Sequence, residues 1–216
     1  MKGQIRIITG QFGGRTISTP VSHATHPMSE RARAGIFNVL ISQGFNFDDV
    51  KVLDLFAGSG ALGFEALSRG ASSVVLVDKN RSVIDTFHKN MKQLSIPKEK
   101  ILFLPKNVFG FKGDTDFEFS TRREGKNASI LEPSEAEKPN RRFDLVFCDP
   151  PYGDFAEISD KLVDLFDDLR TSDNAFLVLS RPSNSTFLEL RNWRSLGAKK
   201  YAEATIDFYE RKKDAK

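Results

Sequence analysis

The sequence predicts an α/β protein built on a parallel, doubly wound sheet. Short apolar runs of strand length alternate with segments whose apolar residues recur at helical spacing. Two of these runs, at residues 52–55 and 143–148, end abruptly in an acidic residue and turn formers, as parallel strands do where they reach a ligand crevice. The length of 216 residues and the hydrophobic content of 39% allow one well-formed core.

The first 44 residues predict a small N-terminal extension ahead of the main domain, which takes residues 45–216. Residues 4–9 read as a strand, and residues 15–18 as its hairpin partner after a glycine-rich turn. Ser29 is the expected N-cap of a helix whose apolar face continues until Gly44.

From residue 50 onward, strands and helices alternate. Strands are expected at 52–55, 73–77, 101–104, 143–148 and 176–179, and helices at 61–69, 82–94 and 155–169. After Trp193, residues 200–210 read as an edge strand with a bend, one arm of a closing antiparallel hairpin. Residues 110–142 interrupt this alternation because they are polar and charged and almost free of aliphatic residues, which predicts a loop insertion, either a long exposed loop or a mobile hairpin.

Charge is distributed unevenly, although the formal net charge is only +3. Residues 1–29 contain no Asp or Glu, and further arginines follow just after Glu30. A basic arm of this kind suits a nucleic-acid surface, because phosphate contacts supply most sequence-independent affinity. A solvated face of a terminal segment is the alternative. The candidate RNA-binding residues are Arg6, Arg15, Arg31 and Arg33.

No apolar run approaches the roughly 20 residues of a membrane span, and no signal-type stretch follows Met1. The single cysteine, Cys148, cannot form an internal disulfide, which is typical of a reducing compartment. We therefore expect a cytoplasmic protein that does not contact a membrane. No spacing of residues indicates a metal site.

A cofactor loop follows the first predicted strand. Gly58, Gly60 and Gly63 satisfy G-x-G-x-x-G between a strand and a helix, so that a ligand can approach the backbone at the helix N-terminus. Asp78 ends the next strand about 20 residues later, where a carboxylate can accept hydrogen bonds from both ribose hydroxyls.

A nicotinamide dinucleotide would fit this pattern too. Asp54 favours S-adenosylmethionine, because a carboxylate beside the loop suits the cationic ammonium group of the methionine moiety and repels a pyrophosphate. The candidate cofactor-binding residues from this region are Asp54, Phe56, Gly58, Ser59, Gly60 and Asp78.

The second acidic strand end, Asp149-Pro150-Pro151-Tyr152, predicts a site that holds a planar amine. Two prolines fix the backbone and remove two N–H donors, which leaves carbonyls free to accept. If Asp149 accepts one amine hydrogen and the Pro150 carbonyl the other, the nitrogen lone pair turns toward the sulfonium methyl while Tyr152 stacks on a flipped base. These four residues are the catalytic candidates, and a proline-stiffened turn is the structural alternative.

At these residues the chain resembles the aminomethyltransferases of nucleic acids that carry the (D/N)PPY motif. It is more narrowly similar to the bacterial small-subunit (16S) ribosomal RNA guanine-N2 methyltransferases, through residues 5–10 with Gly14-Arg15, residues 27–38 and Phe208-Tyr209-Glu210. That family implies a seven-stranded, Rossmann-like methyltransferase fold, S-adenosylmethionine as methyl donor and one guanine as acceptor. Asn107 stands where related enzymes usually place an Asp near the adenine, which implies a cofactor contact there.

The resulting hypothesis is methyl transfer from S-adenosylmethionine to the N2 amine of a guanine in small-subunit ribosomal RNA. Its expected partner is that RNA, within the small ribosomal subunit or an assembly intermediate, and nothing demands more than a monomer. Three alternatives stay open: an adenine-N6 methyltransferase acting on RNA or DNA, an NAD(P)-dependent oxidoreductase, and a non-catalytic RNA-binding protein. No separate DNA-recognition domain is evident in the sequence, which counts against a DNA enzyme.

Overall fold

A computed structural model of the chain describes residues 3–20, 28–81, 83–111 and 142–213. Its strands are β1 (Gln4–Arg6), β2 (Thr16–Ser18), β3 (Lys51–Leu55), β4 (Ser73–Val77), β5 (Ile101–Leu104), β6 (Phe143–Cys148), β7 (Thr171–Pro182), β8 (Trp193–Tyr201) and β9 (Ala204–Arg211). Its helices are α1 (Glu30–Ser42), α2 (Ala61–Ser68), α3 (Val83–Leu94) and α4 (Phe155–Asp168). Single 3₁₀ turns stand at η1 (Lys98–Lys100), η2 (Val108–Gly110) and η4 (Tyr152–Asp154).

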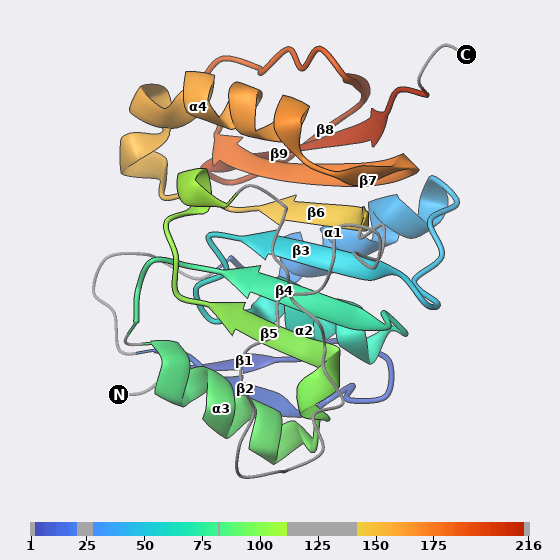
Figure 1. Ribbon diagram of the computed structural model, residues 1–216, viewed down its shortest axis with the longest axis vertical. Helices are drawn as coiled ribbons and strands as arrows, with labels where there is room; N and C mark the ends of the chain where they lie inside the picture. Colours follow the sequence, from blue (N-terminus) through green and yellow to red (C-terminus); the bar gives the residue numbers. More distant parts are fainter. Residues whose placement is uncertain (1–2, 21–27, 82, 112–141, 214–216) are drawn as a thin grey trace, which may run out of the picture.

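Seven of these strands form one sheet in the order β5-β4-β3-β6-β7-β9-β8 (Figure 1). The first five are parallel to one another, whereas β9 runs antiparallel to both of its neighbours. The chain order reverses between β3 and β6, which is the topological switch point where open α/β sheets bind ligands. The α/β, Rossmann-like fold class predicted from the sequence is confirmed.

Side-chain alternation along the strands divides the interior into two cores. Even-numbered residues of β3, β4 and β7, such as Val52, Leu76 and Val178, pack toward α1, α2 and α3. Odd-numbered residues of the same strands, such as Leu53 and Leu179, pack toward α4 and the η2 turn. Because successive strand residues point to opposite faces, polar side chains at even positions just beyond these strands belong to the α1–α3 side.

The N-terminal hairpin of β1 and β2 is fastened to the helices on this side. Glu65 of α2 is fully buried and accepts hydrogen bonds from the backbone N–H groups of Ile8, at 2.7 Å, and Thr9, at 3.2 Å. Asn90 of α3 bonds the N–H and the C=O of Ser18, at 2.8 and 2.9 Å. The hairpin therefore shares one core with the main sheet, while the expected division into two domains at residue 44 stays a prediction.

Most elements lie where the sequence predicts them, and Ser29 is the N-cap of α1, accepting from Ala32 N–H at 3.1 Å. The C-terminal strands differ. Residues 200–210 include the turn between β8 and β9 and most of β9, so the predicted antiparallel hairpin is confirmed. Their predicted place at the edge was wrong, because β9 lies inside the sheet. The true edge, β8, is mostly exposed and polar, so no apolar pattern signalled it. The predicted loop at 110–142 lies almost wholly outside the described residues.

None of the helices within the described ranges is long and apolar enough to cross a bilayer.

Candidate active site at the carboxyl ends of the parallel strands

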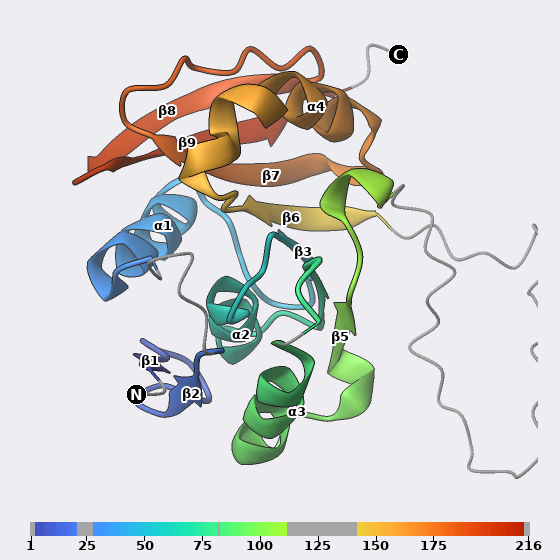
Figure 2. The ribbon, with the colours of Figure 1, turned by 90° about the vertical axis from the view of Figure 1, so that its left-hand side faces the viewer.

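Four neighbouring strands end at one level of the sheet, and three of them are followed there by a polar residue. The pairs that set this level are Val77 with Leu55, Leu55 with Cys148, and Cys148 with Leu179. The residues that come next along these strands are Asp78, Phe56, Asp149 and Ser180. Since adjacent strands are about 4.8 Å apart, the two predicted sites form one continuous edge, which faces the viewer in Figure 2.

The loop after β3 has the backbone geometry of a ligand cradle. Phe56, Gly58 and Gly60 adopt positive φ angles of 56°, 51° and 73°. A side chain added at Gly58 would meet nothing closer than the Phe56 carbonyl oxygen at 3.9 Å. Glycine at 58 therefore serves the backbone turn and leaves open space above it, where the backbone can approach a ligand.

Gly63 has a different task. A Cβ there would come within 2.5 Å of a methyl carbon of Leu76 and 2.8 Å of one of Val74, so glycine lets α2 pack directly against β4. Close packing of helix on strand is the role of the third glycine in the nucleotide-binding loops of Rossmann folds.

Asp78 is half-buried at the end of β4 and ties the loop to the next strand. Its two oxygens accept from the backbone N–H groups of Gly58 and Asn80, each at 2.8 Å. Each carboxylate oxygen retains a further lone pair, so both can still accept from a ligand hydroxyl.

Asp54 holds the loop from beneath. Its side chain lies on the α2 side of β3, is 2% exposed, and accepts from the Gly63 N–H at 3.0 Å. Burial raises the pKa of this carboxyl well above its ordinary value, and the nearby Asp149 and Asp78 raise it further. In this structure Asp54 supports the helix N-terminus rather than facing the open space. Its expected contact with a ligand ammonium group stays a prediction.

Two further predicted residues stand on this side of the edge. The Phe56 ring meets Phe109 of η2 edge to face, with centroids 6.0 Å apart, so the loop and the turn after β5 are neighbours. Asn107 begins that turn and accepts from the Phe109 N–H at 3.1 Å. Ser59 is half-buried on the loop itself.

The Asp149 to Tyr152 segment leaves β6 beside this loop. The Asp149 N–H bonds to the Leu55 carbonyl at 3.4 Å, which closes the ladder between β3 and β6. The Pro151 carbonyl accepts from Asp154 N–H at 3.3 Å, whereas none of the described groups donates to the Pro150 carbonyl. Burial raises the pKa of the Asp149 carboxyl to about 6, and the neighbouring Ser180 hydroxyl opposes that rise. The segment thus presents two hydrogen-bond acceptors, the Asp149 carboxylate and the Pro150 carbonyl oxygen, and none of the described groups donates to the Pro150 oxygen.

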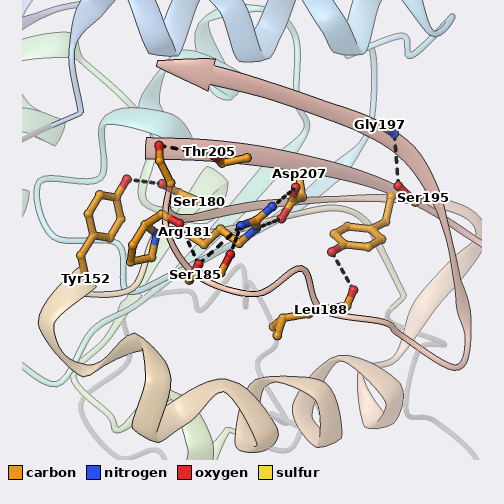
Figure 3. A network of polar contacts seen from close by, with 12 residues as sticks. Tyr152, Ser180, Arg181, Ser185, Leu188, Ser195, Gly197, Thr205 and Asp207 are labelled. Carbon is orange, nitrogen blue, oxygen red and sulfur yellow. Dashed lines mark hydrogen bonds and ion pairs between the residues drawn. The ribbon is translucent and has the colours of Figure 1, made fainter. Parts of the chain in front are cut away.

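Ser180 joins this segment to β7, and the analysis of the sequence did not identify it. Its Oγ lies 2.6 Å from the hydroxyl oxygen of Tyr152 (Figure 3), and Ser180 stands level with Asp149 on the adjacent strand. The sequence does contain a pattern that indicates it: the apolar run 176–179 is followed by a polar residue, as are the other strand ends that predict the site. The Tyr152 ring is 36% exposed, so it can still receive a flat ligand.

The four arginines of the predicted RNA surface have different surroundings. Arg6 and Arg31 are exposed. Arg15 is exposed too, but it donates to the Leu94 carbonyl, at 3.3 Å, and to the Gln93 carbonyl at the C-terminal end of α3. Arg33 is only 2% exposed and donates to the Arg6 carbonyl at 2.9 Å, so it offers no surface for RNA in this structure. RNA contact by the other three stays a prediction.

Within the described part of the chain, no group of three or more His, Cys, Asp or Glu side chains is arranged to hold a metal ion.

Comparison with known proteins matches almost the entire chain. The family model described as "Conserved hypothetical protein 95" matches residues 5–210. The chain is 41% identical over 100 residues to the "Ribosomal RNA small subunit methyltransferase D" of Escherichia coli strain K12, a segment that spans 46% of this chain and 49% of that protein. It is 26% identical over 210 residues to the Haemophilus influenzae protein of the same name, covering 97% of this chain and 95% of that protein.

Solved structures agree in fold. The chain is similar to the Escherichia coli protein yhhF with a TM-score of 0.72 and 26% identity, covering 98% of this chain and all of that one (100%). A Haemophilus influenzae structure gives a TM-score of 0.69 and 25% identity over 98% of this chain and 100% of its own.

Proposed function

The chain belongs to the family described as Conserved hypothetical protein 95, and we propose that it transfers a methyl group from S-adenosylmethionine to the exocyclic N2 amine of a guanine in small-subunit (16S) ribosomal RNA. Relatives named as ribosomal RNA small subunit methyltransferases support the reaction class and the RNA. The chemistry of the Asp149 segment supports a base amine as the acceptor.

The observation that carries the proposal is the adjacency of two half-sites. The loop after β3 and the segment after β6 leave neighbouring strands from the register pair Leu55 and Cys148. A cofactor in the first and a base in the second would therefore lie within reach of each other. Methyl transfer gains most of its rate from such positioning, because it replaces a chance encounter by a fixed geometry.

The loop residues fit S-adenosylmethionine. The open space at Gly58 admits a ligand close to the backbone, and the half-buried Asp78 keeps lone pairs for two ribose hydroxyls. Phe56 and the Asn107 turn would border the adenine, and Asp54 would hold the loop in shape from below. When bound, the cofactor supplies an electrophilic methyl group on a sulfonium whose departure as a neutral thioether is favourable.

The segment from Asp149 to Tyr152 would orient the acceptor amine and accept the proton that the methylated amine loses. Asp149 and the Pro150 carbonyl each accept one N2 hydrogen, and Tyr152 supports the base plane. Bound S-adenosylmethionine would supply its methyl group to the N2 lone pair, and its sulfur would keep the electron pair of the broken carbon–sulfur bond. The methylated amine then loses one proton, and Asp149, with its pKa of about 6, can receive it.

The same groups could hold the N6 amine of adenine, so an adenine-N6 methyltransferase is the second candidate. The names of the relatives favour ribosomal RNA over DNA in either case. We further propose that the protein works as a monomer in the cytoplasm, on the small subunit or an assembly intermediate.

The decisive experiment is transfer of labelled methyl groups to unmodified small ribosomal subunits, to their free RNA and to duplex DNA, followed by nucleoside analysis. We expect N2-methylguanosine with a ribosomal substrate and nothing with DNA. Formation of N6-methyladenosine would mean that adenine is the methylated base, with S-adenosylmethionine still the methyl donor. A lack of product from every substrate would contradict the proposal and favour a non-catalytic RNA-binding protein or an oxidoreductase.

A further inference from the structure

Beyond β7, on the side of the sheet away from the cofactor loop, the carboxyl edge continues over β9 and β8. Three register pairs connect β6 to β8 across this part of the sheet: Cys148 with Leu179, Ser180 with Ile206, and Ile206 with Lys199. Lys199 therefore stands at the level of Asp149, three strands away, which is about 14 Å at about 4.8 Å per strand. An exposed cation thus lies on the same edge of the sheet as the candidate active site.

Two adjacent lysines of β8 lie on opposite faces of the sheet. The cross-strand neighbour of Lys199 is Ile206, which packs in the α1–α3 core. Lys200 belongs to the other face, because successive strand residues alternate, and its neighbour there is Thr205. Both lysines are exposed. They therefore differ in the face that they present and not in charge or in position along the chain.

A groove of about 490 Å³ lies between α1 and β8, which are neighbours in Figure 2. Its lining includes Asn38, Ser42 and Gln43 of α1 and Lys199 of β8, whereas Lys200 is not part of it. The described lining contains no Asp or Glu. Because β8 is the last strand of the sheet, one row of its backbone N–H and C=O groups also has no strand partner. Such a lining suits a polar, negatively charged ligand.

Arg31 extends this surface toward the carboxyl edge. Arg31, Gly35, Asn38 and Ser42 are three or four residues apart, so they share one face of α1. Gly35 lies against the end of β8, because a Cβ there would come within 1.9 Å of the Tyr201 hydroxyl oxygen. The exposed Arg31 therefore stands one helical turn beyond this contact, in line with the groove.

The cations of this surface are free to meet a ligand. Arg191 and Arg194, near the other end of β8, are each paired with an acid. Neither Arg31 nor Lys199 forms an ion pair with another described residue.

We propose that the groove between α1 and β8, together with Lys199 and Arg31, binds the sugar–phosphate backbone of the RNA strand that carries the target base. The inference rests on the proposed function. A flipped base stays attached to its strand, so the flanking nucleotides must cross the edge beside Asp149. The cofactor loop occupies the direction of β3 and β4, which leaves the direction of β7, β9 and β8. Unpaired cations there neutralise phosphates and release their counterions.

An open edge strand can also pair with a strand of another protein or of a second copy of this chain. Lys199 and Lys200 disfavour this occupant, because charged side chains on an edge strand oppose the addition of a further strand. Glu203, in the turn after β8, is not part of the groove lining, so no described acid there would repel phosphates. The charge of the groove therefore favours RNA.

The first test compares Lys199→Ala with Lys200→Ala. Each variant removes one exposed ammonium group, but only the first removes it from the groove. Filter binding of unmodified small-subunit RNA is measured between about 50 and about 200 mM salt. Loss of one phosphate contact should make the fall in affinity over this range about 2.5-fold smaller in Lys199→Ala than in the wild type. Lys200→Ala should behave as the wild type does.

The second test introduces a negative charge into the groove. Asn38→Glu places a carboxylate on the exposed face of α1 that lines it, and should weaken RNA binding at low salt by about fivefold through repulsion of phosphate. Asn38→Gln is the matched control, because it has the same length without the charge, and should bind as the wild type does. Binding of S-adenosylmethionine and the thermal midpoint, recorded for every variant, identify a folding defect.

Three results would overturn the inference. The first is a Lys199→Ala variant with the affinity and salt dependence of the wild type, since Lys199 would then only protect the edge strand. The second is an equal loss in Lys199→Ala and Lys200→Ala. The third is a wild-type dimer in sedimentation that Asn38→Glu dissociates, which would assign the groove to a second copy. Failure of the proposed function is recognised separately, because the wild type would then transfer no methyl group to small-subunit RNA.

Discussion

Two regions of the molecule contain charged and polar side chains: the contact of Glu65 in α2 with the N-terminal hairpin, called the clamp below, and the carboxyl edge of the sheet. The hydrogen-bond partners of these side chains differ between the two regions. In the clamp, the buried Glu65 accepts on both oxygens, from two backbone N–H groups and from Arg69 at 2.9 Å. At the edge, burial raises the pKa of Asp149 to about 6, and the Pro150 carbonyl next to it receives no hydrogen bond from the described residues.

This difference separates a structural polar group from a functional one. A buried carboxylate with a complete set of donors stabilises the fold and has little capacity left for a ligand. A carboxylate held with too few partners is costly to the fold, and that cost is characteristic of sites that await a substrate. Sequence alone does not distinguish the two, because both residues are acids close to an apolar run.

The largest expected effect is on the edge. Asp149→Ala should lower methyl transfer by at least about 100-fold, because the acceptor amine loses its orientation. Cofactor affinity should change by less than about twofold, since Asp149 lies on the acceptor side. Radiometric transfer and calorimetric titration of S-adenosylmethionine measure the two quantities. Near-normal methyl transfer by this variant would contradict the interpretation of Asp149 as a functional carboxylate and Glu65 as a structural one.

The clamp should respond in stability. Glu65→Ala removes the acceptor for two backbone donors and leaves Arg69 without its buried partner, so we expect a loss of about 2 to 4 kcal/mol in the free energy of unfolding. Glu65→Gln keeps one acceptor oxygen and should lose less. Urea unfolding followed by circular dichroism provides both values. A fully stable alanine variant would mean that the clamp does not hold the hairpin.

An intermediate effect is expected at Asp78. Asp78→Ala should weaken S-adenosylmethionine binding by about 1 to 3 kcal/mol, because charge-assisted hydrogen bonds to the ribose are lost along with the Gly58 tether. Asp78→Asn, which retains one acceptor oxygen, is the control. Its affinity for S-adenosylmethionine should lie between those of the wild type and the alanine variant. Unchanged affinity in the alanine variant would show that the ribose lies elsewhere.

The smallest effects concern two exposed arginines. Arg15→Ala should cost about 1 kcal/mol in stability, because Arg15 caps the C-terminal carbonyls of α3. Arg31→Ala should leave stability unchanged and reduce the salt dependence of RNA binding by about one ion equivalent. Equal behaviour of the two variants in both assays would refute the division into structural and RNA-facing cations.

Sequence reasoning anticipated the positions of the central elements and the family. The parallel strands up to β6 and the helices that cover them follow from apolar periodicity, because a buried strand must be apolar on both faces. The resemblance to ribosomal RNA methyltransferases is confirmed by the family match. β8 was missed since its side chains are mostly exposed, and a polar edge strand carries no hydrophobic pattern.

The sequence by itself determined the fold class, the glycine loop and the acidic ends of two strands, because these depend on local conformation and on the alternation of apolar residues. Only the tertiary structure decided which polar groups are buried or hydrogen-bonded within the fold and which can still contact a ligand. It buried Arg33, turned Asp54 beneath the loop and set Ser180 level with Asp149. Those outcomes depend on strand register and on contacts between residues far apart in the chain, which no local pattern encodes.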